Sequence, residues 1–211
     1  MILVTACFPI ELRWIARRPG VRVVRTAMGE PSGASLDRLG DTTAGTTMMI
    51  STGFAGGIDP RAARGDLALA RIVRHRDEEI GIDPKLVDRA RRALNGRPFV
   101  VRIGPCASAD GVLGPDEKKA LAEQDVTSVD MESGPLARWA SAHGIPFLAL
   151  RAVLDPADTE LPFSADRPLW TSVLRHPIAV AQLARHAVSV GRGLGRAVNA
   201  VVDAFSGGPD V

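Results

Sequence analysis

Cysteine is scarce in this chain, and neither cysteine stands in a disulfide or metal-binding pattern. Among 211 residues there are two, Cys7 and Cys106. Two isolated cysteines build no disulfide framework and no zinc motif, which favours a reducing compartment. The four histidines show no metal-ligand spacing and have no serine or cysteine partner motif. The sequence therefore predicts no metal and no cofactor, and each cysteine is predicted to be a small core residue.

Long apolar runs are also missing. No stretch of about 18 uncharged apolar residues occurs, so no membrane-spanning helix is predicted. The first residues lack the basic start and long apolar centre of a signal peptide, and Glu11 would interrupt one. We therefore expect a cytoplasmic protein. A net charge of +2 gives no general reason to expect nucleic acid as a partner.

The composition and the order of apolar segments predict one α/β domain. Hydrophobic residues make up 45% and charged residues 24% of the chain, which is ordinary for a globular protein with one buried core. Strand-like apolar runs alternate with helix-like stretches, which favours a mostly parallel sheet covered on both faces. We expect a single-domain, three-layer α/β fold with a mixed, mostly parallel central sheet flanked by helices, over residues 1–205, and a flexible tail at 206–211. The expected strands are 2–7, 21–26, 47–52, 66–73, 99–103 and 146–152, and the expected helices are 11–17, 84–94, 115–123 and 134–142.

Two acids at the ends of predicted elements are the strongest local sign of a site. Glu132 precedes the helix expected at 134–142, and Asp155 follows the strand expected at 146–152. In an open α/β sheet, ligands bind in the crevice at the carboxyl ends of the strands, which is where Asp155 would lie. The alternative is that Glu132 only starts a helix and Asp155 only begins a turn.

Four short blocks support a more specific interpretation. They are Ile-Ser-Thr-Gly-Phe-Ala-Gly-Gly at 50–57, Gly-Asp-Leu at 65–67, Val-Asp-Met-Glu-Ser at 129–133 and Arg-Ala-Val-Leu-Asp-Pro-Ala-Asp at 151–158. In these blocks, which occur in the family's order, the chain resembles the purine nucleoside phosphorylase and nucleosidase superfamily. The resemblance is to the branch that cleaves methylthioadenosine and adenosylhomocysteine and to its hopanoid-associated relatives. It implies cleavage of the N-glycosidic bond of a 5'-substituted adenine nucleoside.

The resemblance gives the two acids complementary roles. Breaking a purine–ribose bond requires an acid for the base and a group that stabilises the sugar. Asp155 is implied to protonate or hydrogen-bond N7 of adenine, and Glu132 to accept hydrogen bonds from the ribose hydroxyls. Met131 would pack on the ribose face, or it is simply a core residue. Arg151 is predicted to be a structural charge at a strand end that pairs locally.

Other parts of the substrate site are implied by position. The Gly53–Gly57 segment is expected to be a turn whose amides can approach a sugar or an anion, or else only a tight connection. Phe54 stands where the methylthioadenosine enzymes carry a small polar residue. Ser108, Val112 and Leu113 fall in the segment where the family places the loop that walls the purine.

The nucleophile is less constrained. The relatives that hydrolyse use a glutamate soon after the first strand to hold the attacking water. The resemblance implies this role for Glu11, the only acid there, although it is offset by about one position; otherwise Glu11 is an exposed acid that opens the helix expected at 11–17. Phosphorolysis would need a phosphate site, for which Arg25, Ser51 and the loop 29–33 are candidates. However, no arginine precedes the glycine-rich segment in the way it does in the trimeric and hexameric phosphorylases of the resembled superfamily. Hydrolysis is therefore favoured over phosphate as co-substrate. A member that binds nucleosides without turnover is a further alternative, supported by the short region 29–47 and by the displaced position of Glu11.

The C-terminal segment 169–205 departs from the methylthioadenosine enzymes. It mixes arginines and histidines with apolar residues, a pattern typical of a helix on an anionic membrane surface, of a closing helix on the sheet or of a dimer contact. It is similar to the tail of the hopanoid-associated phosphorylases, which act on adenosylhopane. The resemblance also implies a homodimer, and the segment suggests peripheral contact with the inner membrane face.

Overall fold

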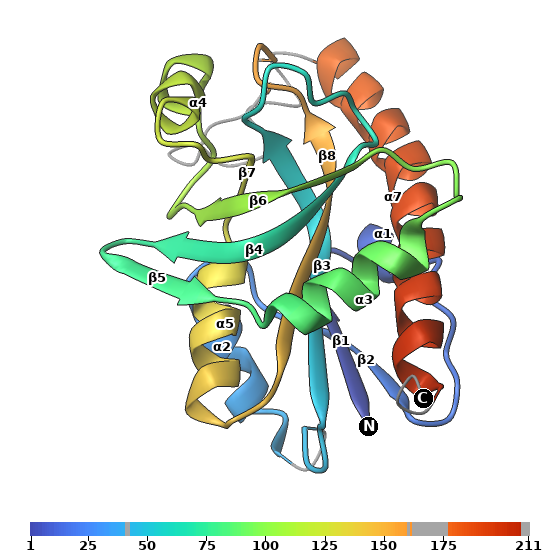
Figure 1. Cartoon of the computed structure of the whole chain (residues 1–211). Helices are drawn as coiled ribbons and strands as arrows, with labels where there is room; N and C mark the ends of the chain where they lie inside the picture. The colour runs from blue at the N-terminus through green and yellow to red at the C-terminus, as the bar shows by residue number, and fades with distance from the viewer. Residues whose placement is uncertain (41–42, 160, 162–176, 208–211) are drawn as a thin grey trace.

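The apolar segments of the chain pair into an eight-stranded sheet that closes on itself in the computed structural model (Figure 1). The structure describes residues 1–40, 43–159, 161 and 177–207. Strands β3, β8, β4, β6 and β7 form a ring, since β3 pairs with both β7 and β8, and β4 with both β8 and β6. The strands are β1 (Ile2–Ala6), β2 (Val21–Arg25), β3 (Met48–Gly57), β4 (Leu67–His75), β5 (Glu78–Gly81), β6 (Val101–Ser108), β7 (Ser128–Asp130) and β8 (Phe147–Asp155).

The sheet is mixed and mostly parallel, as the sequence predicted. The pairs β1–β2, β1–β3, β3–β8, β4–β6 and β6–β7 are parallel, and β3–β7, β4–β5 and β4–β8 are antiparallel. The predicted α/β fold with flanking helices is thus confirmed. The expectation of an open sheet is corrected, because the antiparallel pairing of β4 with β8 closes the ring.

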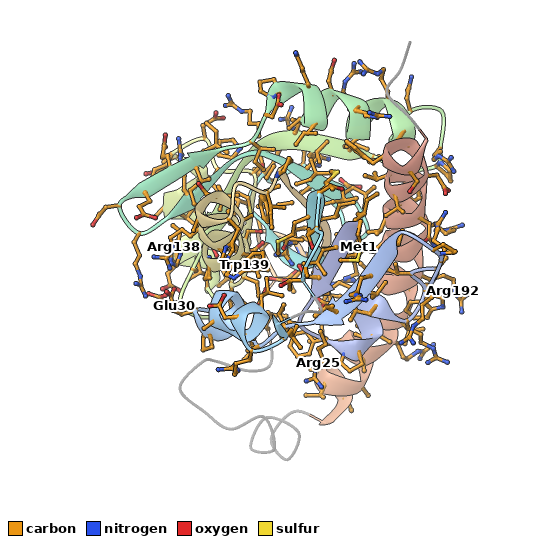
Figure 2. The ribbon with its side chains drawn as sticks, turned by 90° about the horizontal axis from the view of Figure 1, so that it is seen from below. Met1, Arg25, Glu30, Arg138, Trp139 and Arg192 are labelled. Atoms are coloured by element: carbon orange, nitrogen blue, oxygen red, sulfur yellow. The ribbon has the colours of Figure 1, made fainter. Side chains whose placement is uncertain are left out.

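Helices cover the sheet on two sides. On one side α7 packs against α1, α3 and β8, and on the other α5 packs against α2 and the strands (Figures 1 and 2). In Figure 2, Glu30 and Arg138 meet across the α2–α5 side, where the arginine donates to the carboxylate at 2.6 Å. The helices are α1 (Pro9–Leu12), α2 (Pro31–Asp37), α3 (Pro84–Leu94), α4 (Pro115–Ala122), α5 (Ser133–Ala142) and α7 (Pro177–Ser206).

Local sequence explains where α3 and α4 begin. The Asp83 side chain accepts a hydrogen bond from the Lys85 amide at 2.8 Å, and Pro84 fills the first helical position, where no amide is needed. Glu117 reaches back to the Gly114 amide at 2.8 Å at the start of α4. The predicted helix 84–94 coincides with α3. Cys7 and Cys106 are buried, as predicted for core residues.

Two local predictions need correction. Gly53–Gly57 is not a turn, because β3 continues through it and pairs with β8 and β7. The helix expected at 11–17 lies earlier and is shorter, as α1 begins at Pro9 and ends at Leu12. The short region 29–47 contains the helix α2.

The C-terminal segment forms the long helix α7. The first part of the predicted 169–205 segment, up to residue 176, and most of the predicted tail lie outside the described residues. Leu194, Val198 and Val201 of α7 are fully buried against the core. Within the part of the chain that the structure describes, no helix is long and apolar enough to cross a membrane.

Candidate active site

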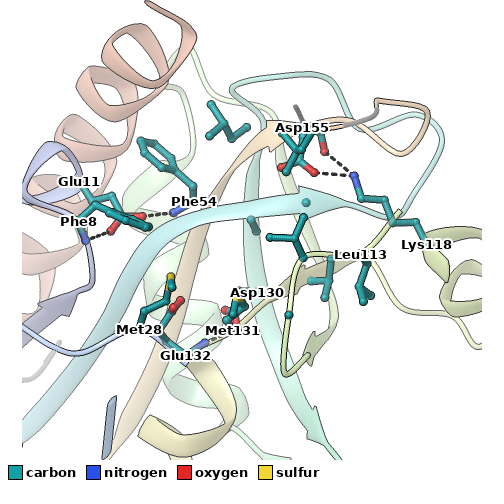
Figure 3. A pocket seen from close by; sticks show the side chains of 17 residues that line it. Phe8, Glu11, Met28, Phe54, Leu113, Lys118, Asp130, Met131, Glu132 and Asp155 are labelled. Atoms are coloured by element: carbon teal, nitrogen blue, oxygen red, sulfur yellow. Dashed lines mark hydrogen bonds and ion pairs between the residues drawn. The ribbon is translucent and has the colours of Figure 1, made fainter. Parts of the chain in front are cut away.

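The ends of β3, β7 and β8 surround a pocket whose walls are mostly apolar (Figure 3). Asp155 and Lys118 lie together at one end, and Glu132, Met28 and Met131 lie together at another part of the wall. Glu11 and Phe54 close a further side. The pocket therefore combines four acids, Glu11, Asp130, Glu132 and Asp155, with an apolar lining, the composition expected of a site that orients a small ligand by a few polar groups.

Asp155 is the last residue of β8, and it is buried beside a lysine. Its Oδ2 lies 2.6 Å from Nζ of Lys118 on α4. The exposed fractions of the two residues are 6% and 2%. Burial raises the pKa of Asp155 above its usual value, whereas the hydrogen bond and charge of Lys118 act to lower it. A carboxyl group under these opposing influences is suited to exchange a proton with a ligand.

Glu132 stands between β7 and α5, with its carboxylate near a backbone amide and an arginine. Oε1 accepts a hydrogen bond from the Gly29 amide at 3.2 Å, and Oε2 lies 4.0 Å from Nη1 of Arg151. Burial raises the pKa of Glu132 to about 7, although the Arg151 charge lowers it. The carboxylate already accepts one hydrogen bond from the protein, and it can accept further hydrogen bonds from a ligand.

Glu11 is not an exposed acid, since only 3% of it is accessible. Its Oε2 accepts from the Phe8 amide at 2.7 Å and its Oε1 from the Phe54 amide at 2.8 Å. Burial raises the pKa of Glu11, and these two backbone hydrogen bonds lower it. Gly53 gives the carboxylate room, because a Cβ at this residue would lie 2.8 Å from Oε1 of Glu11. Its φ of +144° also favours glycine.

Arg151 lies under the pocket, in the middle of β8 and not at a strand end as predicted. Its Nε is 2.6 Å from Oδ2 of Asp130, and Nη2 donates to the hydroxyls of Ser51 and Ser133 at 2.8 and 3.0 Å. Nη1 donates to the Thr52 carbonyl at 2.6 Å. Asp130 in turn accepts the Ser133 amide at 2.9 Å and so caps α5. The guanidinium thus joins β3, β8 and the start of α5 beneath Glu132.

The structure brings together most of the residues that the sequence selected. The pocket is lined by Glu11, Phe54, Val112, Leu113, Met131, Glu132 and Asp155. Gly53 and Ser108 do not line it: Gly53 lies beneath Glu11, and the carbonyl of Ser108 accepts a hydrogen bond from Nδ1 of His75 at 2.8 Å. Sequence reasoning missed Phe8, Met28 and Lys118, which also line the pocket.

The raised carboxyl pKa values predict that the fold is more stable in mild acid. Glu132 titrates at 4.5 when unperturbed and at about 7 in the fold, so between these values the native state binds more protons than the unfolded chain. Stability must then fall as the pH rises through this window. Glu11 and Asp155 act in the same direction. We expect urea denaturation to give a larger free energy of unfolding at about pH 5 than at about pH 8.

Glu132→Gln is the informative variant for this prediction. The amide does not titrate, so the pH dependence of stability should become flatter. Glu30 and Asp59, whose pKa values are lowered by arginines, affect stability only below their unperturbed values of 4.5 and 3.8 and so leave the window clear. A wild-type stability that rises between pH 5 and 8 would contradict the assigned burial of these carboxyls.

Fold and pocket together define an α/β protein with an acid-bearing ligand site at the ends of its sheet strands. Comparison with known proteins then gives the family. Residues 15–190 match the family model described as the Phosphorylase superfamily, and the chain belongs to this family. The superfamily predicted from the four sequence blocks is therefore confirmed.

Individual relatives agree with the family. A curated 5'-methylthioadenosine/S-adenosylhomocysteine nucleosidase from Exiguobacterium sp. is 30% identical over 146 residues, which are 59% of this chain and 63% of that protein. The chain thus matches less than two thirds of that relative's length. A nucleosidase of the same description from S. pneumoniae, solved with the transition-state inhibitor MT-ImmA, has a TM-score of 0.75 at 20% identity over 97% of this chain and 99% of its own. Futalosine hydrolase of Helicobacter pylori gives 0.75 at 16% identity, covering 96% and 97%. At these identities the two structures show a shared fold.

Proposed function

We propose that this protein is a purine nucleosidase that cleaves the N-glycosidic bond of a 5'-substituted adenine nucleoside and releases adenine. The observation that carries the proposal is the meeting of Asp155, Glu132 and Glu11 in one pocket from three separate parts of the chain. The curated nucleosidase relative supports the same reaction class.

Each acid has a role that its surroundings support. Asp155 donates a proton to N7 while the bond between ribose C1' and purine N9 breaks, and the electron pair of that bond stays on the purine. Glu132 accepts hydrogen bonds from the ribose hydroxyls and favours the positive charge that develops on the sugar. Met131 lies beside Glu132 in the same wall and can pack on the ribose.

Water is the nucleophile that the pocket favours. Among the described residues that line the pocket, the cation is Lys118, and it is already paired with Asp155. The arginine considered for phosphate, Arg25, donates through Nε to the Cys7 carbonyl at 2.9 Å, and Ser51 accepts from Arg151. Glu11, held by two amides, can orient a water and take its proton as the oxocarbenium-like sugar is attacked. Phosphorolysis is the alternative.

The apolar lining points to an apolar 5' substituent. Phe8 and Met28 line the pocket although 45% and 52% of them are exposed, and Phe54 and Leu154 add further apolar surface. Exposed apolar side chains beside a pocket are expected where a ligand covers them. Substrates of this kind range from a methylthio group, as in the relatives' names, to the lipid-linked adenosylhopane that the sequence resemblance suggested.

The test is release of adenine from a series of nucleosides. Adenosine, methylthioadenosine and 5'-alkyl adenosines of increasing length are incubated with the protein, each with and without phosphate, and free adenine and the sugar product are quantified. We expect adenine and free sugar without phosphate, with kcat/KM rising along the alkyl series because more apolar surface is buried. Release only with phosphate, as a sugar 1-phosphate, would show a phosphorylase, and binding without release would show a non-catalytic member.

The proposal also covers the location and the oligomeric state of the protein. We place it in the cytoplasm as a homodimer, with α7 able to touch the inner membrane face. The exposed apolar residues Ile178 and Val188 lie on α7 together with exposed Arg185 and Arg192, which supports the membrane contact.

A further inference from the structure

Lys118 is a charged residue in an unusual position for a helix that faces solvent. Its neighbours on α4, Asp116, Glu117 and Lys119, are exposed, whereas 2% of Lys118 is accessible. A buried ammonium is costly unless charged and hydrogen-bonding partners surround it. Lys118 lies beside Asp155 at one end of the pocket (Figure 3). This position indicates that the lysine acts on the site and does not serve only to make the helix soluble.

Three oxygen atoms at the end of β8 hold the ammonium. Nζ donates to Oδ2 of Asp155 at 2.6 Å, to the Pro156 carbonyl at 3.1 Å and to the Asp155 carbonyl at 3.4 Å. A lysine has three donors, so these contacts use its full capacity. The ammonium is thus fixed relative to the backbone of the residue whose side chain it binds.

The strand beneath makes room for this pair. A Cβ at Gly56 would lie 3.1 Å from Oδ2 of Asp155 and 3.2 Å from Cε of Lys118. Contacts this short would force the pair to shift. The glycine at position 56 of β3 therefore leaves space for the Lys118–Asp155 ion pair.

We propose that Lys118 is the positioning residue of the acid Asp155, which it orients through Oδ2 and whose carboxylate it stabilises after the proton has left. The proposal rests on the proposed function. Because Lys118 engages Oδ2, Oδ1 is the oxygen left to meet the purine. The proton moves from Oδ1 to N7 as the C1'–N9 bond breaks, Lys118 keeps its own proton, and Asp155 is reprotonated from solvent after adenine leaves.

Other charged groups also act on Asp155. Arg64 lowers its pKa from the side of the β3–β4 connection and donates to the Leu154 carbonyl at 2.8 Å. Glu11, Asp130 and Glu132 line the same pocket. A substitution of Lys118 leaves these groups in the sequence. A change in the pKa of Asp155 in such a variant therefore measures the effect of the lysine.

The kinetic test compares Lys118→Met with Lys119→Met. Both remove one ammonium from α4, but Lys119 is exposed and serves as the matched control. We expect K118M to lower the kcat plateau at low pH by about 10–100-fold, part of the effect of a general acid, with a smaller change in KM. The limb on which activity falls as pH rises should move to higher pH, because Asp155 has lost a cation that lowers its pKa. A merely structural role would lower stability without moving this limb.

A second measurement does not depend on turnover. The Asp155 carboxyl is titrated by 13C NMR in the wild type, K118M and K119M, with D155N used to assign its signal. We expect a higher titration midpoint in K118M and an unchanged one in K119M. Lys118→Gln, which can still donate to the Pro156 carbonyl, is measured alongside so that poor folding of K118M does not decide the matter.

The outcomes separate the two proposals. An unshifted Asp155 midpoint, or a K118M enzyme with wild-type kcat and pH profile, would overturn the role of Lys118. A shifted midpoint in a protein that releases adenine from none of the nucleosides would overturn the proposed function and with it the catalytic part of this inference, leaving a lysine that controls the acid of a binding site.

Discussion

Replacing Asp155 with asparagine should lower the rate of adenine release by about 10²–10⁴-fold, the contribution of a positioned general acid. The amide can donate a hydrogen bond to N7 but cannot give up a proton at neutral pH, so kcat should fall far more than affinity. The measurement is kcat and KM for the best nucleoside of the series, together with the dissociation constant of that nucleoside for the variant.

Asp88→Asn is the matched control for this substitution. Asp88 lies on the exposed surface of α3, where it pairs with Arg91 and Arg92, so its replacement should leave the kinetics unchanged. Loss of affinity in D155N, with no adenine released by the wild type either, would favour the nucleoside-binding alternative. Wild-type kcat in D155N would show that Asp155 is not the acid.

The D155N variant also leaves the buried Lys118 ammonium without its carboxylate, which lowers stability. The double variant with Lys118→Met removes both charges of the pair and should recover part of that stability. It should not recover the rate, because the proton donor is still missing. The double variant thus separates the contribution of the ion pair to stability from the contribution of Asp155 to the rate.

Local signals in the sequence were sufficient where the structure depends on local interactions. The helix α3 was predicted at its observed bounds because Asp83, Pro84 and the apolar spacing act within a few residues. Glu132 and Asp155 could be selected because one precedes a clearly predicted helix and the other follows a clearly predicted strand. Their meeting in one pocket follows from strand ends that the topology gathers together.

Tertiary interactions decided what the sequence could not predict. Gly53–Gly57 has the composition of a turn, yet pairing with β7 and β8 keeps it in a strand. The closure of the sheet depends on the pairing of residues 67–69 with residues 150–152. No local sequence pattern predicts this pairing. No local pattern marks Lys118 as buried, because its burial depends on its partner Asp155, which lies far along the chain.

Arg151→Met is expected to lower the free energy of unfolding by about 3–5 kcal/mol, because it leaves a buried carboxylate without its partner. The side chains of Arg151 and Asp130 are 2% and 1% exposed, so water cannot replace the lost contact. The variant also removes the donors to Ser51, Ser133 and the Thr52 carbonyl. Such a loss is a large share of the roughly 5–15 kcal/mol that stabilises a domain. Urea denaturation followed by circular dichroism gives the value.

Arg91→Met tests whether burial causes the difference. Arg91 forms its ion pair with Asp88 at 3.1 Å on the exposed face of α3, where half of each side chain is accessible, and its loss should change stability by no more than about 0.5 kcal/mol. Arg151→Lys keeps the charge but cannot reproduce the planar set of donors, so it should fall between the two and remains measurable if R151M does not fold. Equal stabilities for R151M and R91M would show that the Arg151–Asp130 pair does not hold β8 to the start of α5, and that Glu132 is positioned by the backbone alone.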